Sequence, residues 1–148
     1  MALPGFDVRG NLPPGEHVAS WTECNERYGY TAGRVLILRQ IKAWLSHMKA
    51  SGCRTVYIDG SFVCAKEIPA DYDACWDATG VDAALLDGAL LVQTEAGRAV
   101  IRQRFGGDIR PDLACPPVSI RPYLRFFQRD RDGNAKGIVR INLRDFMP

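Results

Sequence analysis

The chain lacks any long apolar run and any basic, apolar leader at its beginning. Its 148 residues contain no stretch of 18 uninterrupted apolar side chains, which a membrane-spanning helix requires. The first ten residues, MALPGFDVRG, have neither the basic nor the apolar region of a secretory signal. We therefore expect a cytoplasmic protein that does not enter a membrane.

Histidine and closely paired cysteine are also scarce. The chain has only two histidines, and its five cysteines are widely spaced with no C-x-x-C pair. This pattern argues against a disulfide framework and against a zinc site of the Cys/His type. We expect reduced and mostly buried thiols at Cys24, Cys53, Cys64, Cys75 and Cys115.

Apolar residues make up 47% of the chain and charged residues 24%, which predicts one globular domain over residues 1–148. The net charge of +2 conceals a division along the chain. Residues 59–95 carry eight acidic side chains and one basic, whereas residues 96–148 carry eleven basic and five acidic. The acidic segment fits a solvated face or a divalent-cation site, and the basic segment could meet a polyanion.

Local patterns in the first half predict an extended arm followed by two helices. Residues 1–17 are rich in Pro and Gly, which prevents a long helix there. A capping box from Ser20 to Glu23 predicts a helix over 21–28. Apolar residues spaced by three and four predict a longer helix over 31–52. Its apolar positions are Val35, Leu38, Ile41, Leu45 and Met48.

The middle of the chain predicts strands, which together with the helices indicate an α+β fold with a small mixed sheet. Alternating side chains predict strands over 54–59 and 71–76. A helical region should follow over 82–105, broken near Gly88, and Asp108 should open a short third strand.

The C-terminal region, residues 120–145, predicts a β-hairpin with strands over 123–128 and 137–143. A regular first strand would leave Phe126 or Phe127 exposed. Six arginines interleaved with aromatic residues fit either a nucleic-acid groove or a solvated basic hairpin. They are Arg121, Arg125, Arg129, Arg131, Arg140 and Arg144.

The second predicted strand begins with two aspartates that suit a metal ion. Asp71 and Asp73 flank Tyr72, and successive strand side chains point to opposite faces of a sheet. The two carboxylates therefore share a face. Hard divalent cations prefer such oxygen ligands.

The turn after the first predicted strand suits phosphate. Gly60 has no Cβ and allows a phosphate to approach the backbone, and Ser61 offers a hydroxyl and an N–H group. Lys66, the only basic residue in 59–95, could neutralise a triphosphate. Together with the aspartates, these residues predict a site for the phosphates of a nucleotide.

The Gly60-Ser61 pair with Asp71-x-Asp73 resembles the signature of the DNA polymerase β-type nucleotidyltransferase superfamily, in particular its minimal bacterial members. The resemblance implies a polymerase beta-like core, bound Mg²⁺ or Mn²⁺, and a nucleoside triphosphate substrate, for which we expect ATP. It implies transfer of a nucleoside monophosphate to a hydroxyl of RNA or protein, with pyrophosphate leaving. Minimal members often belong to toxin–antitoxin or defence operons, which implies a partner encoded nearby.

The superfamily resemblance also implies a third carboxylate, supplied by a later strand. Our candidate is Asp108, because it opens the strand expected after the helical region. The less suitable acids lie in predicted turns or near the end of the chain: Asp130, Asp132 and Asp145. If the acid instead belongs at position 142, which holds Asn142, the chain is an inactive binding module of the same fold that regulates a protein or nucleic-acid partner.

A second resemblance covers nearly the whole chain, to a family of small bacterial proteins of unknown function. It is carried by FD at 6–7, GNLPPG at 10–15, YIDGSFV at 57–63, Lys66, and KGIV at 136–139. This resemblance implies no activity.

Overall fold

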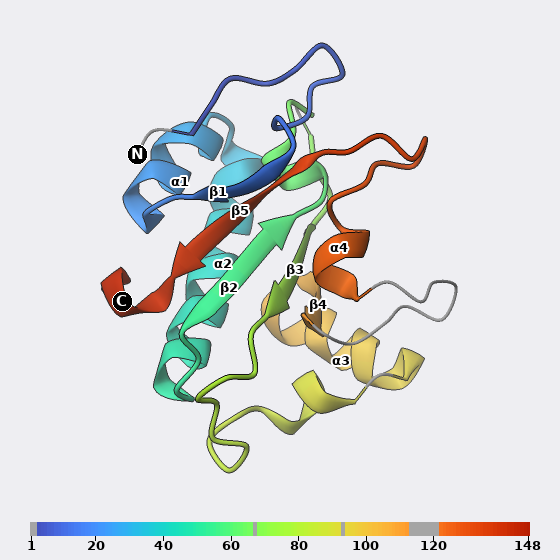
Figure 1. Cartoon of the computed structure of the whole chain (residues 1–148). Coiled ribbons are helices and arrows are strands. Elements are labelled where there is room, and N and C mark those ends of the chain that lie inside the picture. Colours follow the sequence, from blue (N-terminus) through green and yellow to red (C-terminus); the bar gives the residue numbers. More distant parts are fainter. Residues whose placement is uncertain (1–2, 67, 93, 113–121) are drawn as a thin grey trace.

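The computed structural model describes residues 3–66, 68–92, 94–112 and 122–148. It contains a five-stranded mixed sheet with helices on both faces (Figure 1). The strands are β1 (Gly15–Val18), β2 (Thr55–Asp59), β3 (Tyr72–Trp76), β4 (Gly107–Pro111) and β5 (Gly137–Asn142). The helices are α1 (Trp21–Tyr28), α2 (Ala32–Ala50), α3 (Glu95–Phe105) and the short α4 (Tyr123–Phe126). The predicted α+β class is confirmed.

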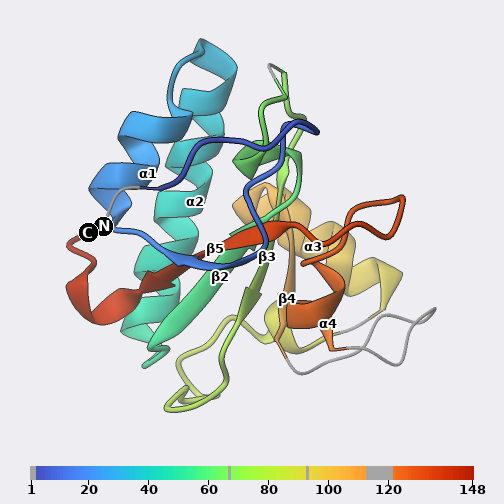
Figure 2. The same cartoon turned by 45° about the horizontal axis from the view of Figure 1, so that its top comes forward.

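The strand order is β1-β5-β2-β3-β4. Strand β2 lies antiparallel to both β3 and β5, whereas β1 pairs with β5 and β3 with β4 in parallel. The parallel pair β3 and β4 is connected through α3, as a parallel connection requires a crossover. Helices α1, α2 and α3 lie on one face of the sheet and α4 on the other (Figures 1 and 2).

The main core lies between the sheet and the three longer helices. The predicted capping box of α1 is present, and the Thr31 hydroxyl accepts the Arg34 N–H at the start of α2. The buried side of α2 includes Leu38, Ile41, Trp44, Leu45 and Met48, which pack against the sheet. Val35 was predicted to belong to this stripe but is 37% exposed, because it lies at the margin of the face that meets the sheet.

The predicted C-terminal hairpin is wrong in its first strand, although an isolated antiparallel bridge joins Arg129 and Ala135 across the predicted loop. Residues 123–126 form the helix α4, and only β5 is a strand. Both edges of β5 are already paired, with β1 and β2, so no edge remains for a hairpin partner. Tyr123 and Phe127, four residues apart, instead pack together on Tyr57, Cys75 and Ile138. Phe126 remains 38% exposed.

Two further predictions need correction. The helical region begins only at α3, because residues 82–87 form turns in which Asp82 and Asp87 accept backbone N–H groups, followed by a 3₁₀ turn at Gly88–Leu91. The N-terminal arm is extended as expected, but its end forms β1, which pairs with β5. The alternation of a four-residue edge strand is too short to reveal this pairing.

Several predictions fall on residues that the structure does not describe: Cys115, Arg121 and the start of the expected hairpin at residue 120. The four described cysteines are free thiols, and three of them are buried. In the described part of the chain, no helix has the length and apolar character needed to cross a bilayer.

Candidate active site

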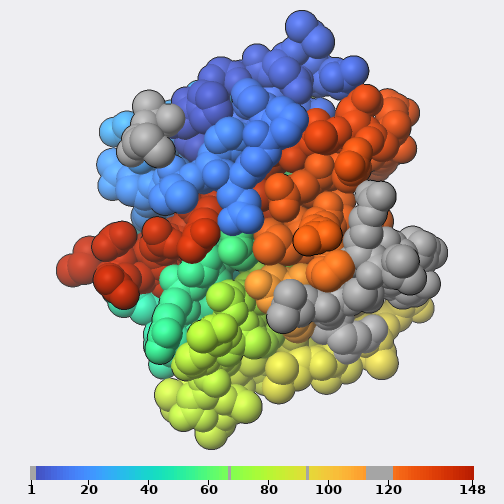
Figure 3. Space-filling view, viewed as in Figure 1, coloured from blue at the N-terminus to red at the C-terminus, as the bar shows by residue number. Residues whose placement is uncertain are grey.

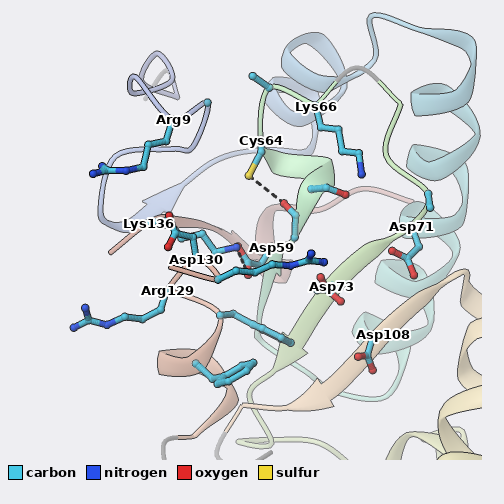
Figure 4. Close-up of a pocket in the computed structure, with 18 of the residues that line it drawn as sticks. Arg9, Asp59, Cys64, Lys66, Asp71, Asp73, Asp108, Arg129, Asp130 and Lys136 are labelled. Carbon is cyan, nitrogen blue, oxygen red and sulfur yellow. Dashed lines mark hydrogen bonds and ion pairs between the residues drawn. The ribbon is translucent and has the colours of Figure 1, made fainter. Parts of the chain in front are cut away.

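A cleft of about 1170 Å³ opens on the α4 face of the sheet, where β2 ends and β3 begins. Every predicted site residue lines it: Gly60, Ser61, Lys66, Asp71, Asp73 and Asp108. Asp71, Asp73 and Asp108 lie along one side, and Lys66 points into the cleft from the loop after β2 (Figure 4). The structure therefore brings together residues that are separated by up to 48 positions in the sequence.

Three carboxylates form a row across neighbouring strands. Asp59 of β2 lies opposite Asp73 of β3, and Asp73 lies beside Asp108 of β4. Residues that are paired across strands project from the same face, so all three side chains belong to the cleft side. Asp71 precedes β3 and adds a fourth carboxylate to the cleft.

Asp73, in the middle of this row, is strongly perturbed. Burial, together with the carboxylates of Asp59, Asp108 and Asp71, raises its pKa to about 7. A Cβ on Gly60 would come within 2.4 Å of the Asp73 Oδ2, so only glycine allows the turn to pack so closely on this carboxylate. Gly60 also has a φ of +84°, which other residues rarely adopt.

Asp59 and Lys136 form an ion pair at the base of the cleft that we did not predict. The Lys136 Nζ lies 3.2 Å from the Asp59 Oδ2, and both side chains are largely buried. Burial raises the pKa of Asp59 to about 6, although Lys136 acts against this shift. The alternation in β2 already placed Asp59 on the same face as Tyr57, but nothing local in the sequence pairs it with Lys136.

Asp108 lies where the third carboxylate was expected, but arginines bind both of its oxygens. Arg98 of α3 donates to Oδ2 at 3.0 Å, and the buried Arg110 donates to Oδ1 at 3.1 Å. The Arg102 guanidinium is also 3.9 Å from Oδ2. The carboxylate thus adjoins Asp73 while being partly neutralised by arginines of α3 and of β4 itself.

The alternative position for the third acid lies elsewhere. Asn142 pairs with Thr55, at the opposite end of β2 from Asp59. It therefore lies at the end of the sheet opposite the cleft, and the strand order gives it no place beside Asp73. Asn142 is not among the residues that line the cleft.

Arg34 shapes the loop that carries Ser61 and Lys66. Its side chain is fully buried, and its guanidinium donates to the carbonyl oxygens of Phe62 at 2.6 Å, of Cys64 at 2.9 Å and of Lys66. Burial lowers the pKa of Arg34, yet a guanidinium stays protonated in proteins. One side chain of α2 therefore fixes three successive parts of this loop.

The N-terminal arm supports the same loop from the other side. The Ala65 N–H donates to the Gly10 carbonyl at 2.8 Å, and the Cys64 thiol lies 3.3 Å from the Asn11 Oδ1. In the space-filling view, the arm and the segment 122–136 meet over the upper part of the sheet (Figure 3). The cleft is consequently walled by segments from the beginning, middle and end of the chain.

Comparison with known protein families assigns the chain to one of them. The model of the DUF6932 family, a family of unknown function, matches residues 4–142. The chain belongs to the DUF6932 family. Neither the curated proteins nor the solved structures contain a match to it. The family's description carries no activity over to this chain, so its function has to be argued from the cleft.

The charges of this DUF6932 cleft are arranged in two halves. Asp71, Asp73 and Asp108 line the side formed by β3 and β4, whereas Arg9, Arg129 and Lys136 lie on the opposite side together with one carboxylate, Asp130 (Figure 4). Among residues 3–66, 68–92, 94–112 and 122–148, no three His, Cys, Asp or Glu side chains form a group that could hold a metal ion as they stand. The carboxylate side nevertheless offers only hard oxygen ligands, which suit Mg²⁺ or Mn²⁺ better than zinc.

Proposed function

We propose that the protein is a metal-dependent nucleotidyltransferase that moves a nucleoside monophosphate from a nucleoside triphosphate, expected to be ATP, to a hydroxyl of RNA or protein. One observation carries the proposal. The Gly60-Ser61 turn and the carboxylates of Asp71, Asp73 and Asp108 line one cleft, although the sequence separates them into three segments. This is the set of groups that phosphate binding and divalent metal binding require together.

The donor chemistry of the cleft fits the metal that such a reaction needs. Asp71, Asp73 and Asp108 would hold it, and the crowding that raises the pKa of Asp73 is the negative charge that a divalent cation relieves. When bound, Mg²⁺ or Mn²⁺ neutralises phosphate oxygens and the attacking oxygen. For Asp108 to take part, it must release at least one of its arginines.

The residues of the chain would divide the remaining work. Lys66 and the Ser61 hydroxyl hold the triphosphate beside the glycine turn. The acceptor oxygen forms a bond to the α-phosphorus, and the bond from that phosphorus to the bridging oxygen breaks as pyrophosphate leaves. Asp108 accepts the proton that the hydroxyl loses.

A second candidate function is a binding module of the same fold without turnover. It is favoured by the arginines on both oxygens of Asp108, which compete with metal and with the proton. The two candidates share nucleotide binding and differ in the role of Asp108.

A thermal-shift measurement with ATP and Mg²⁺ or Mn²⁺ tests the shared part. A ligand at 100 times its Kd adds about 2.7 kcal/mol of stability, which for a chain of 148 residues raises Tm by about 5–11 °C. The double variant Asp71→Asn with Asp73→Asn should lose the metal-dependent shift. The control Asp145→Asn changes an exposed carboxylate beyond the far end of β5 and should keep it. Equal shifts in all three proteins would refute the proposed site.

Turnover is measured separately, as pyrophosphate release from ATP with total RNA or protein offered as acceptor. Release that depends on metal and that Asp108→Asn reduces by a larger factor than it reduces ATP affinity supports the enzyme. A preserved thermal shift with no release from the unaltered protein supports the binding module.

A further inference from the structure

The cleft has a second half that the nucleotide does not need. Its volume of about 1170 Å³ exceeds the roughly 300–1,000 Å³ of sites for single small molecules. Arg9 and Arg129 lie away from Asp71, Asp73 and Asp108, with the carboxylate of Asp130 between them (Figure 4), and Arg131 and Phe126 also line the cleft. Space and chemistry therefore remain for a second, anionic substrate.

Two turns of the same design carry the arginines. At residues 7–11, the Asp7 carboxylate accepts the backbone N–H groups of Arg9 and Asn11. At residues 130–134, the Asp130 carboxylate accepts those of Asp132 and Asn134. In each turn the acid accepts backbone N–H groups, and Asp130 also accepts the Asn134 side-chain amide, so these bonds stiffen the turns that present the arginines. The positive charge of Arg9 also acts on Asp130 and helps to lower its pKa.

The guanidiniums themselves are available. Arg9, Arg129 and Arg131 are exposed, and within the described residues the guanidiniums of Arg9 and Arg131 have no hydrogen-bond or ion-pair partner. Arg129 donates one hydrogen bond to the Gly133 carbonyl at 3.0 Å. Arg9 and Arg129 extend outward on the same side, away from Asp71 and Asp108 (Figure 4).

An aromatic ring lies beside these cations. Phe126 lines the cleft, is 38% exposed, and is held edge-on against Tyr123 with ring centroids 6.2–6.3 Å from its aromatic neighbours. Cations that follow a phosphate backbone and aromatic rings that stack with bases are the combination by which proteins bind single strands.

We propose that this half of the cleft binds a single-stranded polynucleotide, with phosphates on Arg9, Arg129 and Arg131 and a base on Phe126, and that this strand is the acceptor. The role of the strand as acceptor rests on the proposed function. The binding of the strand does not depend on nucleotide or metal. Repeating phosphates match the three guanidiniums that line this cleft better than a protein hydroxyl does, since a protein acceptor requires no such charge.

Fluorescence anisotropy with a labelled 12-nucleotide single-stranded RNA, in EDTA and without ATP, tests the binding. The unaltered protein should bind more tightly than about 100 µM, and log K should fall with log salt by about 0.7 per phosphate contact. In the double variant Arg9→Gln with Arg131→Gln, that slope should decrease by about 1.4. The control Arg39→Gln with Lys42→Gln removes two exposed charges from α2, behind the sheet, and should leave the slope unchanged.

Substitutions of Phe126 test stacking independently of charge. Phe126→Leu keeps an apolar side chain against Tyr123 and should weaken RNA binding about 5- to 150-fold, whereas Phe126→Tyr keeps the ring and should bind as the unaltered protein does. Equal weakening by both double charge variants, or no binding by the unaltered protein, overturns the inference. Transfer of labelled nucleotide to protein without RNA binding overturns it as well, while leaving the proposed function intact.

Discussion

Arg34 offers the sharpest test of how the fold positions the candidate site. Its buried guanidinium bonds three carbonyl groups of the loop 60–66, and its nearest aromatic neighbour is Tyr30, with the guanidinium carbon 4.6 Å from the ring centroid. No carboxylate takes part in these bonds. Arg34 therefore holds the loop in place, and replacing it should lower both the stability of the protein and its affinity for the triphosphate.

The expected loss of unfolding free energy follows from the burial of the three carbonyl acceptors. A hydrogen bond to a charged group contributes about 1.5–3 kcal/mol. The bond to the Phe62 carbonyl is fully buried, whereas those to the Cys64 and Lys66 carbonyls are partly buried, so water can replace the guanidinium there. We expect Arg34→Met to lose one full bond and part of two others, about 3–5 kcal/mol of unfolding free energy. The loss of unfolding free energy in Arg34→Lys should be smaller than in Arg34→Met but not zero, because one ammonium cannot reach all three carbonyls.

Urea unfolding followed by circular dichroism measures the stability. Calorimetric titration with ATP and Mg²⁺ measures the ATP affinity, which reports on the loop 60–66. The matched control is Arg27→Met, which removes a part-buried guanidinium bound to the Leu3 and Pro4 carbonyls, outside the cleft. The control should cost less stability and leave ATP affinity unchanged. If Arg34→Met unfolds within 1 kcal/mol of the unaltered protein, or binds ATP equally well, the loop does not depend on this residue.

Two further predictions concern the row of carboxylates. Gly60→Ala should cost about 1–3 kcal/mol of unfolding free energy, because Gly60 has a positive φ and an added Cβ would meet the Asp73 carboxylate. The control is Gly33→Ala in α2, where nothing lies within 4 Å of an added Cβ. It should be neutral or stabilising in the same unfolding assay. Burial and neighbouring carboxylates raise the pKa of Asp73 from 3.8 to about 7, so without metal the fold loses stability as pH rises through that window. In EDTA, Asp73→Asn should therefore raise Tm at pH 8 and lose this advantage near pH 4; a lower Tm at pH 8 would contradict the assigned crowding.

Much of the helical and central-strand structure could be predicted because its causes are local. The capping box at Ser20 and Glu23 satisfies backbone N–H groups within one turn, and the apolar repeat of α2 depends only on helix geometry. The same holds for the alternation around Asp71 and Asp73. These features specified two helices, two strands and the residue types of the candidate site without reference to distant parts of the chain.

The incorrect and missing predictions have the opposite cause, because they depend on contacts between distant parts of the chain. Residues 123–126 form a helix rather than a strand because β5 has β1 and β2 on its two edges, which no local pattern reveals. The Asp59–Lys136 ion pair joins residues 77 positions apart, and the arginines of the cleft rim come from opposite ends of the chain.

The sequence by itself determined which chemical groups the protein possesses and which of them lie on a common strand face, because side-chain periodicity is fixed by the backbone. Only the tertiary structure decided which strands are neighbours. That order puts Asp108 beside Asp73 and moves Asn142 to the far end of β2. Strand order depends on the burial of whole faces against helices from distant segments, so the candidate third carboxylate could be placed only once the sheet was assembled.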